Sequence, residues 1–432
     1  MKKKVKNVLV FPGGTEVGLE IFRSLRYCKE VILFGVSNGV IEHSTFVYKN
    51  FEIIPNVDEN ECLLKLNELI EKWKIDCIYP ANPLVIDFLN KNRDLIKCKL
   101  ILASKKVVNL TRSKLQTYKF FNTLLPIQKI YSQSSKKIKF PVFIKPSSSY
   151  GSQGTQFIKS QYQFDGIKIK KNEIVSEFLP GKEYTVDCFS DKYKRLIFIG
   201  PRTRERIRMG TSMHCEVPKR ETIKKLEEFA YIIQKNIDLT GAWFFQVKED
   251  ANGCLKLLEI EARIAGTMGF NRVAGVNFPL LSIYVAFDQD VEIGHLISDI
   301  IIDRALVSRY KHNIKFQTVY VDLDDTILIK NSLNIQLLEF LFQCILKKIK
   351  IVLISKSTDK NVIFNLKKLR IHQIFDEIIF IDESDSKSRY ISENNSIYID
   401  DSFSQRMEVY KNCSIPTFDP SMIELLIDER GE

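Results

Sequence analysis

Short apolar runs that alternate with amphipathic stretches constrain the fold of this chain more than any other feature. In the first hundred residues the apolar runs are VKNVLVF, VILFGV, CIYP and KLILAS, and helical patterns separate them. Strands that alternate with helices form parallel sheets, because each helix returns the chain to the same sheet edge. We therefore expect an α/β protein in which residues 1–106 form a small parallel layer.

Length and composition narrow the class of protein. A chain of 432 residues suits two or three domains, at roughly 100–200 residues each. Hydrophobic residues make up 45% and charged residues 27%, which excludes a disordered chain and a disulfide-stapled miniprotein. The net charge of +11 comes from lysines spread along the chain. We expect no nucleic-acid partner, whereas phosphorylated small molecules remain suitable partners.

The cysteines and the apolar runs indicate the compartment. None of the nine cysteines forms a CxxC pair, so we expect reduced thiols and neither a metal knuckle nor a redox motif. No apolar run approaches the ~18–20 residues that cross a bilayer, and the first run is too short for a signal peptide. The sequence predicts a cytoplasmic protein with no membrane partner.

A glycine-rich turn follows the first apolar run. It contains Gly13, Gly14 and Gly18, and N–H groups at a helix start can bind an anion. A dinucleotide-binding fold would also place an acid after the second strand to hold ribose hydroxyls. Ser37 and Asn38 stand there instead. This pattern disfavours an NAD-dependent enzyme.

The segment FPVFIKPSSSYGSQGTQFI indicates a phosphate site. It places Lys145 at the end of an apolar strand, ahead of a Ser/Gly loop with Gly151 and Gly154. The amides of such a loop can fold over phosphates while the lysine supplies positive charge. A bare hairpin is the alternative interpretation.

The segment NEIVSEFLPGKEYTV indicates where a nucleoside would bind. The backbone of Glu177, Phe178 and Leu179 can offer a donor and an acceptor to an adenine edge. Glu183 follows a Pro-Gly turn, and its carboxylate can hold both ribose hydroxyls.

A predicted hairpin carries two acids. The turn D-A-N-G sets Gln246 beside Glu259 and Glu261, and the alternation E-x-E-x-R points Arg263 to the same face. Two carboxylates on one face repel each other unless cations neutralise them. A pair of Mg²⁺ ions carried by ATP would do so, and a surface salt-bridge cluster is the alternative.

Four arginines lie in the segment PRTRERIRMGTSMH. Alternate arginines on a strand share one face, so Arg202, Arg204 and Arg206, with Arg208 beyond them, could clamp a carboxylate or a phosphate. A solvated edge strand is the alternative. His214 in the same segment is interpreted as structural.

These motifs together resemble the ATP-grasp superfamily over residues 1–308. The resemblance implies a Rossmann-like layer over residues 1–106 and an ATP-grasp domain over residues 107–308. It also implies these roles: phosphate binding by Lys114 and Lys145, adenine binding by Glu177 to Leu179, ribose binding by Glu183, Mg²⁺ binding by Gln246, Glu259 and Glu261, and contact of Arg263 with phosphate or the reacting carboxylate. In many relatives asparagine stands where this chain has Glu261, and an extra negative charge there could change metal preference or number.

The resemblance also implies an activity. Relatives use the γ-phosphate of ATP to activate a carboxylate as an acylphosphate, which an amine or another nucleophile then captures. Such a reaction needs cations around the transferring phosphate and little acid–base machinery. The implied cofactors are ATP and Mg²⁺, with Mn²⁺ as an alternative. The implied substrates are a small carboxylate and an amine, either of which could be phosphorylated.

The strand pattern restarts after Arg309 with TVYVDLDDTILI. Asp322, Asp324 and Thr326 follow a strand, where parallel sheets present their chemistry. The strand IKIVLIS ends in Ser355 in the same way. The later signals are Lys387 in ESDSKSRY and the pair Asp400 and Asp401 after SIYI.

These signals resemble the haloacid-dehalogenase-like phosphatase superfamily over residues 314–432. The resemblance implies a Rossmann-like domain with Asp322 as nucleophile, Asp324 as general acid/base, Ser355 and Lys387 as phosphate holders, and Asp400 and Asp401 as Mg²⁺ ligands together with the first two aspartates. An aspartate attacks phosphorus only if cations offset the repulsion between anions. Asp325 replaces the usual glycine. The intervals between the motifs are too short for a cap domain, so we expect an open site.

Three hypotheses follow for the whole chain. The first is a bifunctional enzyme, in which an ADP-forming carboxylate–amine ligase is fused to a phosphatase of the same pathway, such as surface-polysaccharide or small-molecule biosynthesis. The second is a ligase whose C-terminal domain is a scaffold or a dimerisation module. The third is a regulatory protein that binds ATP only as a ligand. The sequence leaves the substrates and the oligomeric state open.

Overall fold

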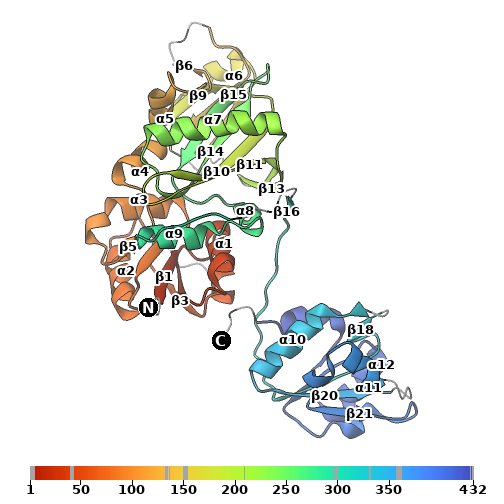
Figure 1. Ribbon diagram of the computed structural model, residues 1–432. Helices are drawn as coiled ribbons and strands as arrows, with labels where there is room; N and C mark the ends of the chain where they lie inside the picture. Colours follow the sequence, from red (N-terminus) through yellow and green to blue (C-terminus); the bar gives the residue numbers. More distant parts are fainter. Residues whose placement is uncertain are drawn as a thin grey trace. The chain divides into compact units, whose positions relative to one another are not determined.

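The computed structural model describes residues 5–38, 43–131, 135, 137–148, 154–208, 210–294, 297, 300–329, 332–356, 362–428 and 430. The chain divides into two compact units, Met1–Leu306 and Val307–Glu432 (Figure 1). Parallel and antiparallel sheets both occur, so the fold is mixed α/β. Within the described part of the chain, no helix is long and apolar enough to cross a membrane.

The first unit begins with a five-stranded parallel sheet in the order β3-β2-β1-β4-β5. The strands are β1 (Lys6–Phe11), β2 (Val31–Ser37), β3 (Asn50–Ile53), β4 (Cys77–Pro80) and β5 (Lys99–Leu100). Side chains of successive strand residues point to opposite faces, and Val8 and Leu9 accordingly belong to different apolar clusters. Helices α2 (Glu61–Lys72) and α3 (Pro83–Lys91) pack in one cluster, and α1 (Glu16–Leu25) and α9 (Phe278–Ala286) pack in the other.

A four-stranded antiparallel sheet in the order β11-β10-β14-β15 forms the centre of the first unit. Its strands are β10 (Glu183–Ser190), β11 (Leu196–Thr203), β14 (Gly241–Glu249) and β15 (Leu255–Glu261). Helix α7 (Arg220–Asn236) lies across this sheet in Figure 1 and buries Leu226, Phe229 and Ile233 against it. One face of the sheet is thus filled with apolar side chains, and the other is free to carry charged ones.

A smaller antiparallel sheet follows the order β6-β9-β7-β8. It contains β6 (Ile130–Tyr131), β7 (Val142–Pro146), β8 (Gln156–Ile158) and β9 (Glu173–Glu177), with the short helix α6 (Gln161–Asp165) beside it. Helices α4 (Lys105–Thr111) and α5 (Lys114–Phe121) precede it along the chain. The remaining elements of the unit are a three-stranded sheet of β12 (Glu205–Arg208), β13 (Thr211–Glu216) and β16 (Ile301–Asp303), and helix α8 (Gly269–Val273).

The second unit is built on a five-stranded parallel sheet in the order β21-β20-β17-β22-β23. The strands are β17 (Thr318–Val321), β20 (Lys350–Ser355), β21 (Glu377–Phe380), β22 (Ser396–Ile399) and β23 (Thr417–Phe418). The helices are α10 (Ile335–Leu346), α11 (Val362–Lys368) and α12 (Phe403–Cys413), and the short hairpin β18 (Leu328–Ile329) and β19 (Ser332–Leu333) follows β17. Between β17 and β22, the described residues contain no further sheet that could serve as a cap.

Candidate active sites

The predicted hairpin of β14 and β15 is present and sets two acids beside an amide. Gln246 lies directly opposite Glu259 in the strand register, and a bulge follows that pair. Gly253 in the turn has a φ of +77°, a backbone conformation that glycine adopts without strain. The Asp250 carboxylate accepts hydrogen bonds from two N–H groups of the turn, which fixes the register of the acids.

Glu259 lies among cations. Its Oε2 atom is 3.3 Å from Lys114 Nζ. In the amide orientation that satisfies its neighbours, Gln246 donates to Glu259 Oε1 at 3.2 Å and accepts from Arg204 Nη1 at 3.3 Å. Burial alone would raise the pKa of Glu259, but Lys114, Arg204 and Arg263 outweigh it and lower that pKa. The carboxylate is therefore held in its charged form.

Glu261 lies between two arginines and is only 4% exposed. Arg112 Nη1 is 3.5 Å from its Oε1 atom, and Arg263 Nε is 3.3 Å from its Oε2 atom. The pKa of Glu261 is raised. Burial and the neighbouring Glu259 raise it by more than Arg263 and Arg112 lower it. Sequence reasoning missed Arg112, although its position two residues before Lys114 in TRSK was a usable signal.

The start of α5 is tied to the end of β7. The N–H of Lys114 donates to the Ser147 carbonyl at 2.9 Å, and the hydroxyls of Ser113 and Ser147 lie 3.2 Å apart. These contacts bring together the two lysines predicted to bind phosphate. Burial, and then the charge of Lys114, lowers the pKa of Lys145 to about 7. Lys145 Nζ donates to the Tyr118 hydroxyl at 3.3 Å.

Part of the predicted phosphate loop can be described. Gly154 has a φ of +72°, and a Cβ atom there would lie 3.0 Å from the ring of Pro146. The loop therefore returns close to the strand that carries Lys145. Gly151 lies outside the described residues.

The predicted adenine segment is partly used by the fold itself. Glu177 N–H donates to the Lys129 carbonyl, and Phe178 N–H donates to the Pro141 carbonyl. The Glu177 carboxylate accepts from the Lys129 N–H at 2.8 Å. A nucleotide would thus have to use carbonyl groups of this segment or the N–H of Leu179, whose side chain is buried.

The predicted ribose carboxylate is engaged by two cations. Glu183 accepts from Arg204 Nε at 2.6 Å and from Lys248 Nζ at 3.3 Å. Arg204 also contacts Gln246, so Glu183 and the acids of the hairpin belong to one charged network.

The structure does not bring the predicted arginine clamp together. The strand is interrupted between β11 and β12, and Arg206 has a φ of +44°, so the alternation of faces is lost. Arg202 is buried and donates to Asp187 Oδ2 at 2.7 Å. Arg206 and His214 both contact the exposed Asp303, and Arg208 is exposed. Only Arg204 reaches the network around Glu259.

The glycine turn after β1 packs against Tyr48. A Cβ atom on Gly13 would lie 3.0 Å from that ring, and one on Gly35 would lie 2.7 Å from it. The buried Tyr48 hydroxyl donates to the Gly18 carbonyl at 3.0 Å. Close packing against Tyr48 therefore accounts for Gly13 and Gly35, and a Cβ atom on Gly18 would collide with the Pro12 carbonyl oxygen.

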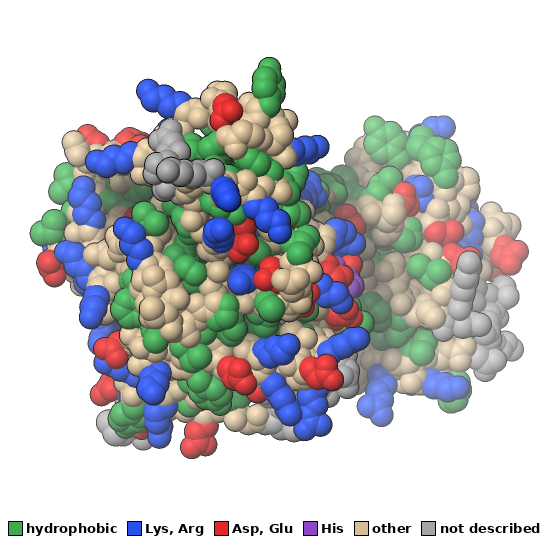
Figure 2. All heavy atoms as spheres, turned by 90° about the horizontal axis from the view of Figure 1, so that it is seen from above, with side chains coloured by type: hydrophobic (Ala, Val, Ile, Leu, Met, Phe, Trp, Pro, Cys, Tyr) green, Lys and Arg blue, Asp and Glu red, His purple; other side chains and the backbone are tan. Residues whose placement is uncertain are grey.

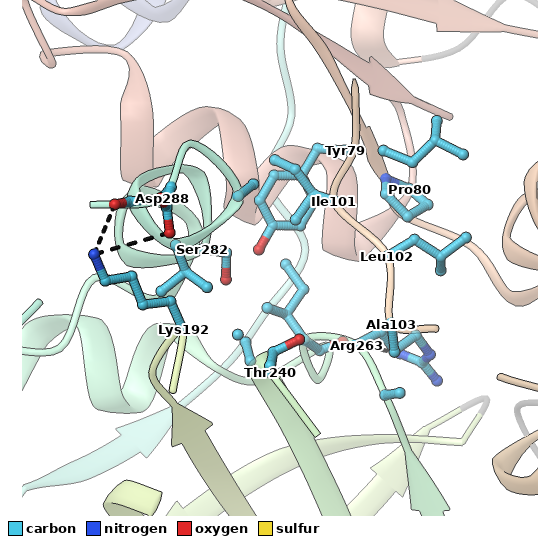
Figure 3. A pocket seen from close by; sticks show the side chains of 17 residues that line it. Tyr79, Pro80, Ile101, Leu102, Ala103, Lys192, Thr240, Arg263, Ser282 and Asp288 are labelled. Carbon is cyan, nitrogen blue, oxygen red and sulfur yellow. Dashed lines mark hydrogen bonds and ion pairs between the residues drawn. The ribbon is translucent and has the colours of Figure 1, made fainter. Parts of the chain in front are cut away.

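A pocket of about 330 Å³ lies next to Arg263 (Figure 3). The ends of β4 and β5 and the residues that follow β15 form its walls, and the hydroxyls of Tyr79 and Ser282 lie within it. Lys192 and Asp288 form an ion pair at one side. On the face that Figure 2 presents, lysine and arginine side chains are spread among acidic ones and form no single basic patch.

The second unit gathers three aspartates at the carboxyl edge of its parallel sheet. Asp322 follows β17, and Asp400 and Asp401 follow the neighbouring strand β22. Carboxylate oxygens of the three lie within 4.8 Å of one another. The pKa of Asp322 is raised to about 7, and burial is the main cause. Lys387 lowers this pKa, and the negative charge of Asp400 raises it further. Oxygen ligands of this kind suit Mg²⁺.

Lys387 connects two of these aspartates. Its Nζ donates to Asp322 Oδ1 and, at 2.7 Å, to Asp400 Oδ2, and the side chain is fully buried. Thr326 donates to Asp322 at 3.3 Å and accepts from the N–H of Asp401 at 3.0 Å. The Tyr398 hydroxyl also donates to Asp400.

Helix α12 holds the turn that carries Lys387. Glu408 accepts from the hydroxyls of Ser386 and Ser388, which flank that lysine, and from Asn412 at 2.6 Å. These hydrogen bonds lower the pKa of Glu408 although burial would raise it. Sequence reasoning missed Glu408, because it lies far from Lys387 along the chain and matches no motif.

The remaining predicted residues of this unit lie at strand ends. Ser355 ends β20 and is buried, whereas Asp324 is exposed and lies outside the three-aspartate cluster. Asp325 has a φ of +56°. Glycine adopts that conformation without strain, and aspartate is among the other residues that tolerate it best.

The comparisons with known proteins agree with the geometry of the first unit. Residues 170–304 match the family described as ATP-grasp in the biosynthetic pathway with Ter operon. The first unit has the ATP-grasp fold. A comparison with curated protein sequences finds no match.

Solved structures support this fold at low sequence identity. Biotin carboxylase from Campylobacter jejuni is 17% identical over 67% of this chain and 72% of its own, with a TM-score of 0.57. N5-carboxyaminoimidazole synthetase from Staphylococcus aureus, in complex with ADP, is 17% identical over 67% of this chain and 79% of its own, with a TM-score of 0.56. The biotin carboxylase domain of 2-oxoglutarate carboxylase from Hydrogenobacter thermophilus is 16% identical over 68% and 72%, with a TM-score of 0.56, and was solved with MgADP and bicarbonate.

Proposed function

We propose that this chain is a bifunctional enzyme. In the proposal, residues 1–106 and 107–308 form an ATP-dependent, ADP-forming carboxylate–amine ligase. Residues 314–432 form a Mg²⁺-dependent phosphatase of the haloacid-dehalogenase type, acting on a phosphorylated compound of the same pathway. The ligase is supported by the ATP-grasp fold of the first unit and by the ADP and magnesium bound in its structural neighbours.

The observation that carries the ligase proposal is the charged network around Glu259. Lys114, 3.3 Å from Glu259, and Lys145 beside it would supply the positive charge that a triphosphate needs, and Arg263, which also pairs with Glu261, would contact phosphate or the reacting carboxylate. Gln246 and Glu259 offer oxygens that would hold Mg²⁺, which would offset charge on the transferring phosphate. Fixed cations of this kind stabilise the charge that develops on an acylphosphate.

The phosphatase proposal depends on Lys387, which is held between Asp322 and Asp400. Asp322 would attack phosphorus and form an aspartyl phosphate, while Asp324 would protonate the leaving alkoxide and later deprotonate water. Mg²⁺ at Asp322, Asp400 and Asp401 would reduce the repulsion between the two anions. A scaffold without catalysis would not need a buried lysine shared by two aspartates.

Product analysis tests the proposal. The full chain is incubated with ATP, Mg²⁺ and panels of carboxylic acids and amines, and nucleotides are separated by chromatography. We expect ADP and phosphate that depend on both an acid and an amine. AMP and pyrophosphate would contradict the acylphosphate mechanism, and binding of ATP without any turnover would favour an ATP-binding regulatory role.

The two activities can be connected through a phosphorylated substrate. A phosphate on the amine would serve as a recognition handle during ligation, and the open phosphatase would remove it afterwards. Fusion raises the local concentration of the intermediate at the second site. The expected signature is a phosphorylated amide that accumulates in Asp322→Asn, heavier than the final product by about 80 Da, the mass of one HPO₃ group, because the attacking carboxylate is gone.

A further inference from the structure

Both oxygens of Glu261 are occupied by arginines. Oε1 is 3.5 Å from Arg112 Nη1 and Oε2 is 3.3 Å from Arg263 Nε. The side chain of Glu261 is 5% exposed, so little solvent reaches either pair. A divalent ion could bind this carboxylate only after one of these buried ion pairs had been broken, which is unfavourable because it leaves a buried charge without a partner.

Arg112 is itself held on its other side. Its Nε and Nη2 atoms donate to the two carboxylate oxygens of Asp87 at 3.0 and 3.1 Å. Asp87 belongs to α3 of the parallel layer, and Arg112 is the C-cap residue that follows helix α4. A bidentate pair of this geometry fixes the guanidinium plane. Asp87, Arg112 and Glu261 thus connect the parallel layer to the last residue of β15.

Glu259 has a different environment. Its side chain is 21% exposed, and its nearest cation is Lys114, whose ammonium group is carried on a flexible chain. Its other oxygen is 3.2 Å from the Gln246 amide, a neutral group. A metal ion can reach Glu259 by displacing the single ammonium group of Lys114, whereas it can reach Glu261 only by displacing an arginine that a second partner holds in place.

We infer that Glu261 is a positioning residue, that its charge is neutralised by Arg112 and Arg263, and that the nucleotide site holds one divalent ion through Glu259. This inference rests on the proposed function of the first unit. It accounts for a glutamate where many relatives have asparagine, because the additional negative charge has a dedicated partner in Arg112.

The number of nucleotide-dependent metal ions tests this inference. Mn²⁺ serves as the probe, and its free concentration is followed by electron paramagnetic resonance in titrations of the full chain with and without the non-hydrolysable analogue AMP-PNP. Ions bound to the second unit do not need the nucleotide and cancel in the difference, and the ions that AMP-PNP binds in buffer without protein are measured separately and subtracted. We expect one nucleotide-dependent ion in the wild type and none in Glu259→Gln.

The variant Glu261→Gln separates the two roles. The inference predicts one nucleotide-dependent ion with an affinity within about threefold of wild type, since no metal–ligand bond is lost. Loss of that ion, or two ions in the wild type, would overturn the inference. Absence of any nucleotide-dependent ion in the wild type would overturn the proposed function and this inference with it.

Arg112→Met keeps Glu261 and removes its cation, so it decides the question even if Glu261→Gln fails to fold. With Oε1 released, we expect a second nucleotide-dependent ion. The matched control is Asp87→Asn, which leaves the Arg112 charge in place and should retain one ion. An unchanged count of one in Arg112→Met would contradict the inference.

Discussion

The chain contains two parallel sheets with the same strand order, and among the described residues only the second of them carries a cluster of three acids. In the first unit the order is β3-β2-β1-β4-β5, and in the second it is β21-β20-β17-β22-β23, so the first strand of each sheet lies at its centre. Parallel sheets of this kind present ligands at their carboxyl edge, next to the central strand. Topology alone would therefore predict a site in both.

The residues that follow the central strands differ. After β1 the chain continues into a glycine turn that packs against Tyr48, and after β2 the buried Ser37 stands where an acid would be needed for a dinucleotide. After β17 and β22 come Asp322 and Asp400, joined by Lys387. The edge of the first sheet is closely packed, and the charged network around Glu259 in that unit includes the antiparallel hairpin of β14 and β15. Strand order locates a possible site, and the strand-end residues decide whether one exists.

The largest effect is expected at the charged edge of the second sheet. Lys387→Met leaves Asp322 and Asp400 buried beside each other without their cation, and breaking a buried pair costs about 3–5 kcal/mol. Phosphatase activity should fall by roughly a thousandfold or more, and the second unit should unfold at lower temperature in metal-free buffer. Rates with p-nitrophenyl phosphate and calorimetry measure both quantities.

The control for Lys387→Met is Lys350→Met. Lys350 forms an exposed pair with Glu377 on the same sheet, so its loss should change either quantity little. Equal losses of activity and of thermal stability in the two variants would show that the ion pairs of Lys387 contribute no more than an exposed ion pair.

A smaller effect is expected when the hairpin loses a charge. Glu259→Gln should reduce ligation by about a hundred- to a thousandfold, since one preorganised electrostatic contact contributes ~3–4 kcal/mol to the transition state. Binding of ATP in the absence of metal should persist. Ligation rates and calorimetric titration with ATP distinguish these outcomes. Glu228→Gln on the exposed side of α7 is the control, and ligation within threefold of wild type in Glu259→Gln would remove Glu259 from the site.

A larger residue at the packed edge of the first sheet should lower the free energy of unfolding. In Gly35→Ala the new methyl group would lie 2.7 Å from the Tyr48 ring, so the ring must move, at a cost of about 1–3 kcal/mol. Urea unfolding measures the change. Gly166→Ala is the control, because its methyl group would lie 3.7 Å from the nearest atom. A Gly35→Ala protein as stable as the control would show that Tyr48 is loosely packed against β2.

The smallest effect is a pH dependence of nucleotide binding. The pKa of Lys145 is about 7 in the free protein because of burial and Lys114, and bound phosphate should raise it. Binding then takes up a proton above pH 7, so affinity should fall as pH rises, by about fivefold between pH 7 and 8. Calorimetric titrations with nucleotide in buffers of different ionisation enthalpy measure how many protons are taken up on binding. Lys145→Arg should flatten this dependence, and a wild type without proton uptake would place Lys145 away from the phosphates.

The sequence predicted the local elements better than the contacts between them. Strand and helix patterns gave the parallel layer and the β14–β15 hairpin, because those patterns depend on neighbours along the chain. The arginine clamp was expected because alternate residues of one strand share a face. The positive φ of Arg206 breaks that alternation, so the arginines do not share a face. A break in a strand is decided by tertiary contacts, such as the ion pair of Arg206 with Asp303.

The residues that position the sites were the hardest to predict. Arg112 reaches Glu261 and Glu408 reaches the serines beside Lys387, each across a large separation in sequence. Glu408 belongs to no motif, and Arg112, although it lies two residues before Lys114, is revealed as a partner of Glu261 only by the fold. The glycine turn is compatible with anion binding in its sequence, and a contact distant along the chain, that of Gly13 with the Tyr48 ring, also favours glycine there.

The most direct test of the account is a crossed assay of two variants of the full chain, Glu259→Gln and Asp322→Asn. ADP formation that depends on acid and amine, and Mg²⁺-dependent hydrolysis of p-nitrophenyl phosphate, are measured on both proteins. The account predicts that Glu259→Gln loses ligation and keeps hydrolysis, and that Asp322→Asn keeps ligation and loses hydrolysis. Loss of both activities in either variant, or hydrolysis that survives in Asp322→Asn, would contradict two independent active sites in this chain.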